Sequence, residues 1–261
     1  MFENKTIIHA LIPARGGSKS IPKKNIRRYD SCPLLVHSII AAQEIPIINR
    51  IVVSTDCKET RKIALKHGAD VPYLRPSNIS GDLSTDLECF QHYLSWLKLM
   101  KQECPDVIIH LRPTYPERNN DILYKCLKKF LEIKDNYTSL RTVVSIEKSL
   151  FKMYTIDKKS NTLIPTYKKY GEIKEPYNQV RQILPKTYLH NGCIDIIKRE
   201  TIENGSVTGD KIYAYIMDKE ETYDIDTEED WIRSLESLSN KISNGMNIIR
   251  SKPINIPVVK K

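Results

Sequence analysis

The stretch LIPARGGSKSIPKKN joins an apolar run to a basic loop that is rich in glycine. Gly16 and Gly17 stand side by side, and backbone without Cβ atoms can turn its N–H groups inward around an anion. Arg15 adds a planar fork of donors, and Lys19 and Lys24 add point charges. Such a loop could hold a triphosphate by charge-assisted hydrogen bonds of about 1.5–3 kcal/mol each. A solvated basic turn would explain the same residues when they are taken alone, and neither G-x-x-x-x-G-K-[ST] nor G-x-G-x-x-G is present.

Two carboxylates in the stretch YDIDTEED form a second candidate. In extended backbone Asp224 and Asp226 point to one face, about 6.6 Å apart along the strand, while Ile225 points into the core. Carboxylate oxygens suit Mg²⁺, a hard cation that keeps waters and binds phosphates as well. Two solvated aspartates before a helix are the competing interpretation. Together with the basic loop, the pair indicates metal-assisted chemistry on a nucleoside triphosphate.

Alternating strands and helices must position these residues. Short apolar runs with β-branched residues predict buried strands, and apolar residues at helical spacing predict helices. Their alternation indicates an α/β fold with a mostly parallel sheet that is covered on both faces. Strands are predicted at 6–12, 50–56, 71–76, 106–114, 142–146, 193–197 and 211–217, and helices at 33–45, 58–69, 85–102, 119–133 and 227–240.

Ligands of such sheets bind beyond the carboxyl ends of the strands. The glycine loop follows the first strand, and the residues 54–56 and 112–114 follow two others, so we expect these three segments to surround one site. Residues 150–190 differ, because they are rich in tyrosine and proline and have weak periodicity. They predict an excursion from the sheet, formed by hairpins or an arm, that could make a dimer contact.

The composition narrows the class of protein. A length of 261 residues with 40% hydrophobic and 28% charged residues suits a cytoplasmic globular protein, and no apolar run reaches the length of a membrane span. The net charge of +9 allows an anionic ligand, but the lysines are spread along the whole chain, so we expect no nucleic-acid partner. The six cysteines and six histidines lack zinc spacing, and His9 and His110, inside apolar runs, are expected to be structural.

The chain resembles the acylneuraminate cytidylyltransferases, the CMP-sialic acid synthetase family. The glycine loop is similar to the family pattern apolar-A-R-x-x-S-K-x-[IL]-x-x-K-N, and six further stretches follow in the family order across roughly residues 5–240. They are RIVVSTD, VPYLRP, LRPTYPER (pattern Q/R-P-T-S-P-L-R), QVRQILP, HNGCIDII (pattern P-N-G-x-I-Y-I) and YDIDTEED. The resemblance implies a three-layer, Rossmann-like nucleotide-diphospho-sugar transferase fold over residues 1–240. It also implies a dimerisation and sugar-side excursion at about 150–190 and a peripheral tail at 241–261.

The reaction that the resemblance implies joins CTP to a nonulosonic, sialic-acid-like 2-keto sugar acid. It yields the CMP-sugar and pyrophosphate for surface glycan synthesis. The anomeric hydroxyl attacks the α-phosphorus, and catalysis is mostly positioning and charge neutralisation. Mg²⁺ as the cofactor and a homodimer without membrane attachment are implied as well. The residues carried over are Arg15, Lys24 and Asp226 as catalytic; Arg15, Lys19, Lys24, Asn25 and Arg75 for the nucleotide; Arg112, Lys152, Arg181, Gln182 and Asn191 for the sugar; and Asp224 and Asp226 for the metal.

Five positions depart from the family pattern, namely Gly16, Arg112 (often Gln), Tyr115, Glu117 and His190. We expect them mainly near the sugar or its approach, and they leave sialic, legionaminic, pseudaminic and other nonulosonic acids open. One alternative is a nucleotidyltransferase for another base or for another sugar acid such as Kdo, although Kdo enzymes typically have R-L-P-G-K-P at the loop. Another is a noncatalytic or nucleic-acid-binding protein on the same fold, which predicts loss of the loop cations or the aspartate pair that this chain retains.

Overall fold

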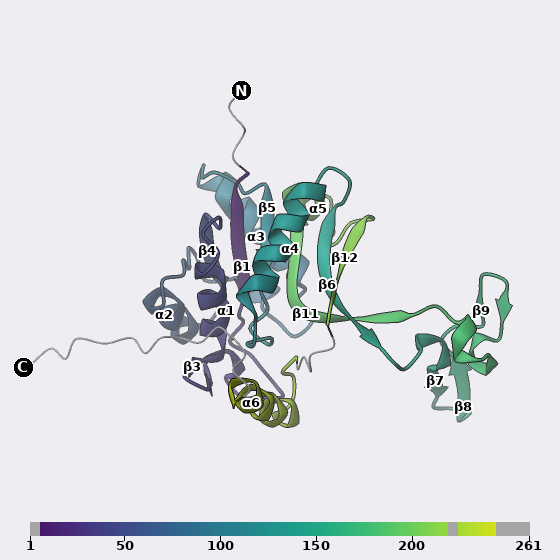
Figure 1. Cartoon of the computed structure of the whole chain (residues 1–261). Coiled ribbons are helices and arrows are strands. Elements are labelled where there is room, and N and C mark those ends of the chain that lie inside the picture. Colours follow the sequence, from purple (N-terminus) through teal and green to yellow (C-terminus); the bar gives the residue numbers. More distant parts are fainter. Residues whose placement is uncertain (1–5, 219–223, 244–261) are drawn as a thin grey trace, which may run out of the picture. The chain divides into compact units, whose positions relative to one another are not determined.

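The computed structural model in Figure 1 describes residues 6–218 and 224–243. The chain divides into two compact units, and each is described by itself. Of the predicted C-terminal tail, residues 244–261 lie outside the described residues. No helix in the described ranges has the length and apolar character needed to cross a membrane. The larger unit comprises 6–142, 191–215 and 224–243, and the smaller unit comprises 143–190 and 216–218.

A six-stranded sheet forms the centre of the fold. Its strands are β1 (Ile8–Pro13), β4 (Arg50–Ser54), β5 (Val107–His110), β6 (Ser139–Ile146), β11 (Thr187–Lys198) and β12 (Ile212–Met217). They lie in the order β12-β6-β11-β5-β1-β4. β1 pairs in parallel with β4 and β5, whereas β11 runs antiparallel to β5 and brings Asp195 opposite His110. The sheet is therefore mixed. Its predicted parallel strands are β5, β1 and β4, and the glycine loop follows β1.

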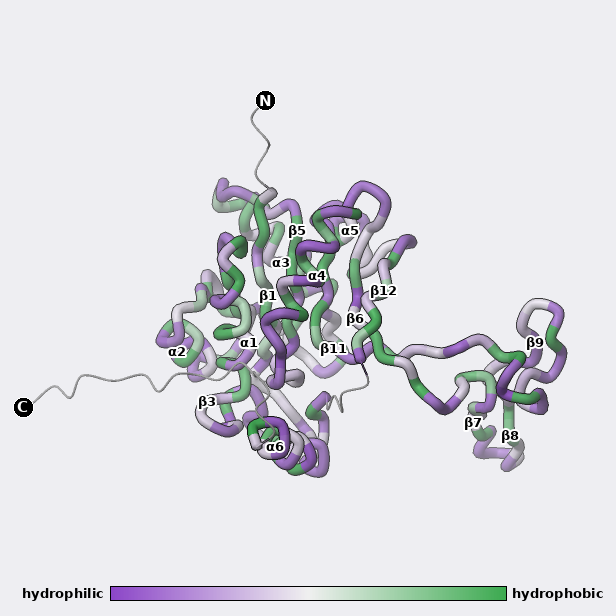
Figure 2. Tube along the Cα trace, in the orientation of Figure 1, coloured by the Kyte–Doolittle hydropathy of each residue, from purple (hydrophilic) through white to green (hydrophobic). Residues whose placement is uncertain are grey.

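Helices cover both faces of this sheet, as the alternating pattern predicts. α3 packs on one face, where Phe90 and Leu94 join Leu11 and Ile108 in the core. α1 and α4 pack on the other face, in front of the sheet in Figure 1, where α3 lies behind it. Figure 2 shows hydrophobic residues concentrated along β1 and β5 between these layers. The helices are α1 (Leu34–Gln43), α2 (Lys58–Lys66), α3 (Asp86–Leu99), α4 (Asn120–Ile133), α5 (Arg199–Glu203) and α6 (Glu228–Ser243).

The predicted strand at 71–76 is wrong. Only isolated bridges occur there, joining Val52 to Asp70 and Thr55 to Leu74. Prolines at positions 72 and 76 lack N–H donors, which prevents a continuous ladder. The remaining short elements of this unit are η1 (Lys24–Ile26), β2 (Arg28–Tyr29), β3 (Cys32–Pro33) and η2 (Ser77–Ile79).

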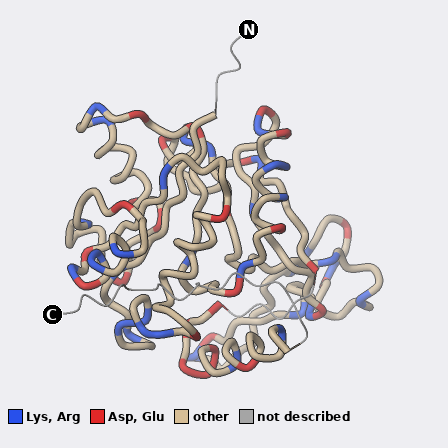
Figure 3. Tube along the Cα trace, turned by 60° about the vertical axis from the view of Figure 1, so that its left-hand side comes forward, with Lys and Arg blue, Asp and Glu red and all other residues tan. Residues whose placement is uncertain are grey.

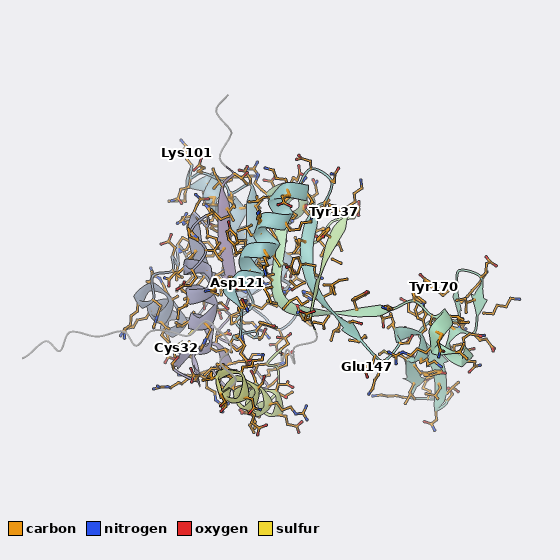
Figure 4. All side chains as sticks on the ribbon, in the orientation of Figure 1. Cys32, Lys101, Asp121, Tyr137, Glu147 and Tyr170 are labelled. Carbon is orange, nitrogen blue, oxygen red and sulfur yellow. The ribbon has the colours of Figure 1, made fainter. Side chains whose placement is uncertain are left out.

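The smaller unit contains the hairpins expected in the excursion. β7 (Tyr154–Asp157) pairs with β8 (Thr162–Pro165), and β9 (Lys169–Tyr170) pairs with β10 (Ile173–Lys174). Phe151 is buried here and packs on the rings of Tyr167 and Tyr170, the latter labelled in Figure 4. Three short 3-10 helices complete the unit: η3 (Leu150–Lys152), η4 (Pro176–Asn178) and η5 (Arg181–Ile183).

Candidate active site

A polar cavity of about 510 Å³ opens where β1 and β5 end. Its wall comes from the glycine loop after β1, the segment that leads into α3, the loop after β5, and the residue two positions before α6. This is the strand end at which the α/β pattern predicts a ligand. The predicted site residues that the cavity brings together are Arg15, Lys19, Lys24, Asn25, Arg75, Arg112 and Asp226.

The glycine loop lies close to the segment that follows β4. Gly16 N donates a 2.8 Å hydrogen bond to Asp56 Oδ1, and a Cβ added to Gly16 would lie only 2.7 Å from Cys57 Cβ. A Cβ on Gly17 would meet nothing within 4 Å. Asn25 Nδ2 donates to Arg15 O at 2.9 Å and so closes the loop. The first glycine is therefore required by the close approach of two backbones, whereas the second is not.

Two cations of this loop form ion pairs with an acidic residue that was not predicted from the sequence. Asp82 forms an ion pair with Arg15, Nη1 to Oδ1 at 3.1 Å, and another with Lys19. The hydrogen bond from Lys19 is the main cause that lowers the pKa of Asp82. Arg15 Nη1 also donates to Gly81 O at 2.7 Å. Because Lys19 and Asp82 are exposed and Arg15 is only half-buried, these pairs are weak and can exchange for a phosphate.

Two further cations are held more rigidly at the wall. Lys24 Nζ donates to Ile225 O at 2.7 Å and to Asp226 Oδ1 at 3.0 Å. Arg75 is buried and donates from Nε to Ser54 Oγ at 3.1 Å and from Nη2 to Ser54 O. The Arg75 guanidinium is thereby fixed at the carboxyl end of β4.

The two aspartates before α6 differ in position. Ile225 is fully buried between them, as expected, and its N–H donates to Thr114 O at 2.9 Å, although the segment is not a strand. Asp226 lines the cavity. Asp224 is exposed and outside the cavity lining, and its Oδ2 would lie 3.9 Å from a Cβ on Gly192. The described residues contain no cluster of three or more His, Cys, Asp or Glu side chains that could hold a metal ion.

Comparisons with known proteins agree with this geometry. The model of a family described as "Cytidylyltransferase" matches residues 9–152. The CMP-N,N'-diacetyllegionaminic acid synthase of Legionella pneumophila is 33% identical over 232 residues, which cover 86% of this chain and 93% of that protein. The chain belongs to the cytidylyltransferase family.

Two further proteins are similar to this cytidylyltransferase. The post-translational flagellin modification protein B of Campylobacter coli is 30% identical over 225 residues, covering 84% of this chain and 90% of the relative. A solved CMP:2-keto-3-deoxy-manno-octonic acid synthetase, complexed with CTP, superimposes with a TM-score of 0.63 at 14% identity. The match covers 90% of this chain and all of that one, and it supports the predicted nucleotide-sugar transferase fold.

Arg118 fixes the loop after β5 in this cytidylyltransferase. It is fully buried and donates to Cys193 O at 2.8 Å, Ser38 Oγ at 2.9 Å and Arg112 O at 2.7 Å. Burial lowers the pKa of its guanidinium to about 10, which leaves it charged at neutral pH. Arg118 therefore holds the backbone that presents Arg112 to the cavity.

The expectation that the departures lie near the sugar is wrong for Glu117. Its carboxylate accepts hydrogen bonds from Tyr29 OH at 2.7 Å, Ser234 Oγ at 2.8 Å and Lys241 Nζ at 2.9 Å. It therefore joins α6 to β2 within the larger unit. Tyr115 is buried as well, and a Cβ added to Gly16 in the glycine loop would lie 2.7 Å from Cys57 Cβ. The spacing of motifs could not predict the contacts of Glu117, because its partners lie on β2 and α6.

The predicted sugar-binding residues are divided between the units. Arg112 and the buried Asn191 belong to the larger unit, where Asn191 Oδ1 accepts from Thr142 Oγ1 at 2.7 Å. In the smaller unit Arg181 and Gln182 line a cavity of about 360 Å³. Lys152 belongs to the same unit, is exposed, and is not part of that lining.

Residues of the cavity that sequence reasoning missed come from two places. Asp82 and Asp86 lie on either side of the N-cap of α3, where Thr85 and Glu88 form a capping box. That capping signal marks a helix N-terminus next to the loop and could have drawn attention to both aspartates. His110, which was expected to be structural, is fully buried and also contributes to the cavity lining.

Proposed function

We propose that this cytidylyltransferase transfers CMP from CTP to a nonulosonic acid and releases pyrophosphate. The observation that carries the proposal is the cavity that gathers Arg15, Lys19 and Lys24 around the glycine loop and faces them with Asp226. Relatives named CMP-N,N'-diacetyllegionaminic acid synthase, similar over most of their length, support a legionaminic-like acid as the first candidate substrate.

The triphosphate would bind the glycine loop by exchanging with Asp82. Arg15 and Lys19 would release the Asp82 carboxylate and donate to phosphate oxygens instead, because their ion pairs with it are exposed. The anomeric hydroxyl of the acid then gives its proton to solvent and its oxygen forms a bond to the α-phosphorus, while the bond from that phosphorus to the oxygen that bridges it to the β-phosphorus breaks. Arg15, Lys19 and Lys24 neutralise the charge of the leaving pyrophosphate.

We propose Mg²⁺ as the cofactor, held by Asp226 with Asp224 as the second candidate ligand. The donor set fits this ion, because both side chains are exposed carboxylates and Mg²⁺ takes its remaining ligands from phosphates and water. When bound there, the ion would supply positive charge beside the phosphates. Lys24 shares Asp226 Oδ1 and thus orients this carboxylate at the cavity wall.

We also propose a homodimer that forms through the smaller unit. Exposed large hydrophobic residues are concentrated on this unit, which is unusual for a free surface. Light scattering after gel filtration should give twice the chain mass of 30.2 kDa. The double variant Ile156→Lys/Leu163→Lys, which changes β7 and β8, should give a monomer. The exposed positions include Tyr154, Ile156, Leu163, Ile164, Tyr167, Tyr170, Val180, Ile183, Tyr188 and Leu189.

A cytoplasmic location, with no membrane or nucleic-acid partner, completes the proposal. None of the six cysteines, all within the described ranges, forms a disulfide, in keeping with a reducing compartment, and CTP is an intracellular nucleotide. Lys and Arg positions alternate with acidic ones over the tube in Figure 3 instead of forming a continuous basic stripe. A nucleic-acid interface would gather its cations along one face.

The test is pyrophosphate release with Mg²⁺ for each pairing of CTP, UTP, ATP or GTP with a panel of nonulosonic acids and Kdo. Release with CTP and a nonulosonic acid, lowered about 10²–10³-fold in Asp226→Ala, is the expected result. Release with Kdo alone, or with another nucleotide alone, would replace the substrate assignment. Absence of release with every pair would refute the proposed reaction.

A further inference from the structure

A compact charged cluster lies at the end of β5, beside the cavity. Arg112 Nη1 donates to Asp195 Oδ2 at 2.6 Å, and its Nη2 reaches Asp86 Oδ2 at 3.4 Å. Arg141 Nε donates to the other oxygen of Asp195 at 2.9 Å. Asp195 itself is 1% exposed. Two guanidinium groups therefore share one buried carboxylate, and this pairing is what makes the burial of Asp195 tolerable.

The cluster is balanced in charge. Arg112 and Arg141 contribute two positive charges, and Asp86 and Asp195 contribute two negative ones. His110 lies between the carboxylates, with Nδ1 3.6 Å from Asp195 Oδ2 and Nε2 3.8 Å from Asp86 Oδ2. Burial, followed by the charge of Arg112, lowers the pKa of His110, so that the ring is neutral at pH 7. Arg112 therefore presents to the cavity a guanidinium that is already paired with two carboxylates.

Arg112 reaches the cavity and Asp195 does not. Arg112, Asp86 and His110 line it, whereas Asp195 stands behind them on β11. His110 Nε2 is buried and has no hydrogen-bond partner within the described part of the chain, so a hydrogen-bonding group remains unused at this wall. A ligand that enters here meets a fixed guanidinium fork and a neutral imidazole.

We propose that Asp195 is a positioning residue that holds Arg112 against the cavity, and that the pair acts as one unit in recognising the sugar acid. This inference rests on the proposed function. Because its charge is already balanced, Arg112 offers directional hydrogen bonds to hydroxyl or carbonyl oxygens of the acid, rather than a net charge to its carboxylate.

The test compares Asp195→Asn, Arg112→Gln and the double variant by pyrophosphate release, with KM measured separately for CTP and for the sugar acid. Each single variant should raise KM for the sugar acid at least tenfold and leave KM for CTP within twofold. The double variant should be no worse than the poorer single variant, because the pair acts as a unit. Asp70→Asn is the matched control, since Asp70 pairs with Arg50 at 2.7 Å outside the cavity lining, and its two KM values should match the wild type.

Thermal denaturation separates positioning from folding. An Asp195→Asn protein that melts at a lower temperature but retains both KM values would overturn the inference, as would additive effects of the two substitutions. If Asp195→Asn does not fold, Arg112→Lys provides the test, because lysine keeps the charge but cannot bridge Asp86 and Asp195 in the same way. A wild-type KM for the sugar acid in Arg112→Lys would overturn the inference. A wild-type protein without turnover would refute the proposed function itself, and an active wild type with unchanged variants would overturn only this inference.

Discussion

Lys24 and Asp226 are 202 positions apart, yet Lys24 Nζ lies 3.0 Å from Asp226 Oδ1. The contact joins the glycine loop to the segment that leads into α6. Its two members differ in freedom, since the Lys24 side chain is 13% exposed and that of Asp226 is 70% exposed. Lys24 is therefore fixed by its surroundings, including Ile225 O, while the Asp226 carboxylate can turn toward a ligand in the cavity.

Asp226→Ala should lower kcat by about 10²–10³-fold, the usual loss when one preorganised electrostatic contact to a reacting group is removed. Its melting temperature should change little, because the Asp226 side of the ion pair is 70% exposed, Lys24 keeps its bond to Ile225 O, and such a pair contributes at most about 1 kcal/mol. Pyrophosphate release and thermal denaturation measure the two effects. Glu229→Ala, an exposed carboxylate in the first turn of α6, is the control and should keep full activity. A kcat within tenfold of wild type in Asp226→Ala would remove this residue from the catalytic group.

Gly16→Ala and Gly17→Ala should behave differently although they are neighbours. The new Cβ at position 16 would meet Cys57 Cβ at 2.7 Å and push the loop outward, whereas position 17 has open space. We expect KM for CTP to rise at least tenfold in Gly16→Ala and to stay within twofold in Gly17→Ala. Adding Cys57→Gly to Gly16→Ala removes the clashing atom and should restore much of the affinity. Equal effects of the two alanine substitutions would show that the close approach at Gly16 is not what matters.

Local patterns in the sequence were enough to predict much of the fold and part of the site. The strand before Gly16 and the periodic helices follow from short-range patterns, and the parallel strand ends then bring Arg15, Arg75 and Arg112 to one cavity. Asp82 and Asp195 were not predicted as residues of the site, because their roles depend on hydrogen-bond partners 67 and 83 positions away. Local spacing contains no information about such pairs. Glu117 was misplaced for the same reason, since its partners lie on elements far along the chain.

Stability should fall as the pH is lowered from 6.5 toward 4, in part because of His9. Burial is the main cause that lowers the pKa of His9 to about 4, and the ring is held by Tyr93 OH at 2.8 Å from Nδ1. A pKa below that of the unfolded chain means that the neutral ring stabilises the fold fully above pH 6.5, and that this stabilisation is lost as the pH falls toward 4. Urea denaturation at a series of pH values measures the slope. His9→Gln should flatten it by up to about 1.4 kcal/mol per pH unit, and an unchanged slope would contradict the assignment.

Glu117→Leu should be strongly destabilising, although the residue is remote from the phosphates. The substitution leaves the ammonium of Lys241, 13% exposed, without its carboxylate, and it removes the acceptor shared by Tyr29 and Ser234. Breaking a buried ion pair in this way costs about 3–5 kcal/mol. Glu117→Gln is the matched variant, because it keeps an acceptor of the same length and should lose clearly less. Chemical denaturation of both variants gives the comparison. The first event on warming Glu117→Leu should be release of α6 from the cluster around Trp231, which tryptophan fluorescence would detect before the main transition. Equal stability of the leucine and glutamine variants would mean that the ion pair with Lys241 does not hold this helix.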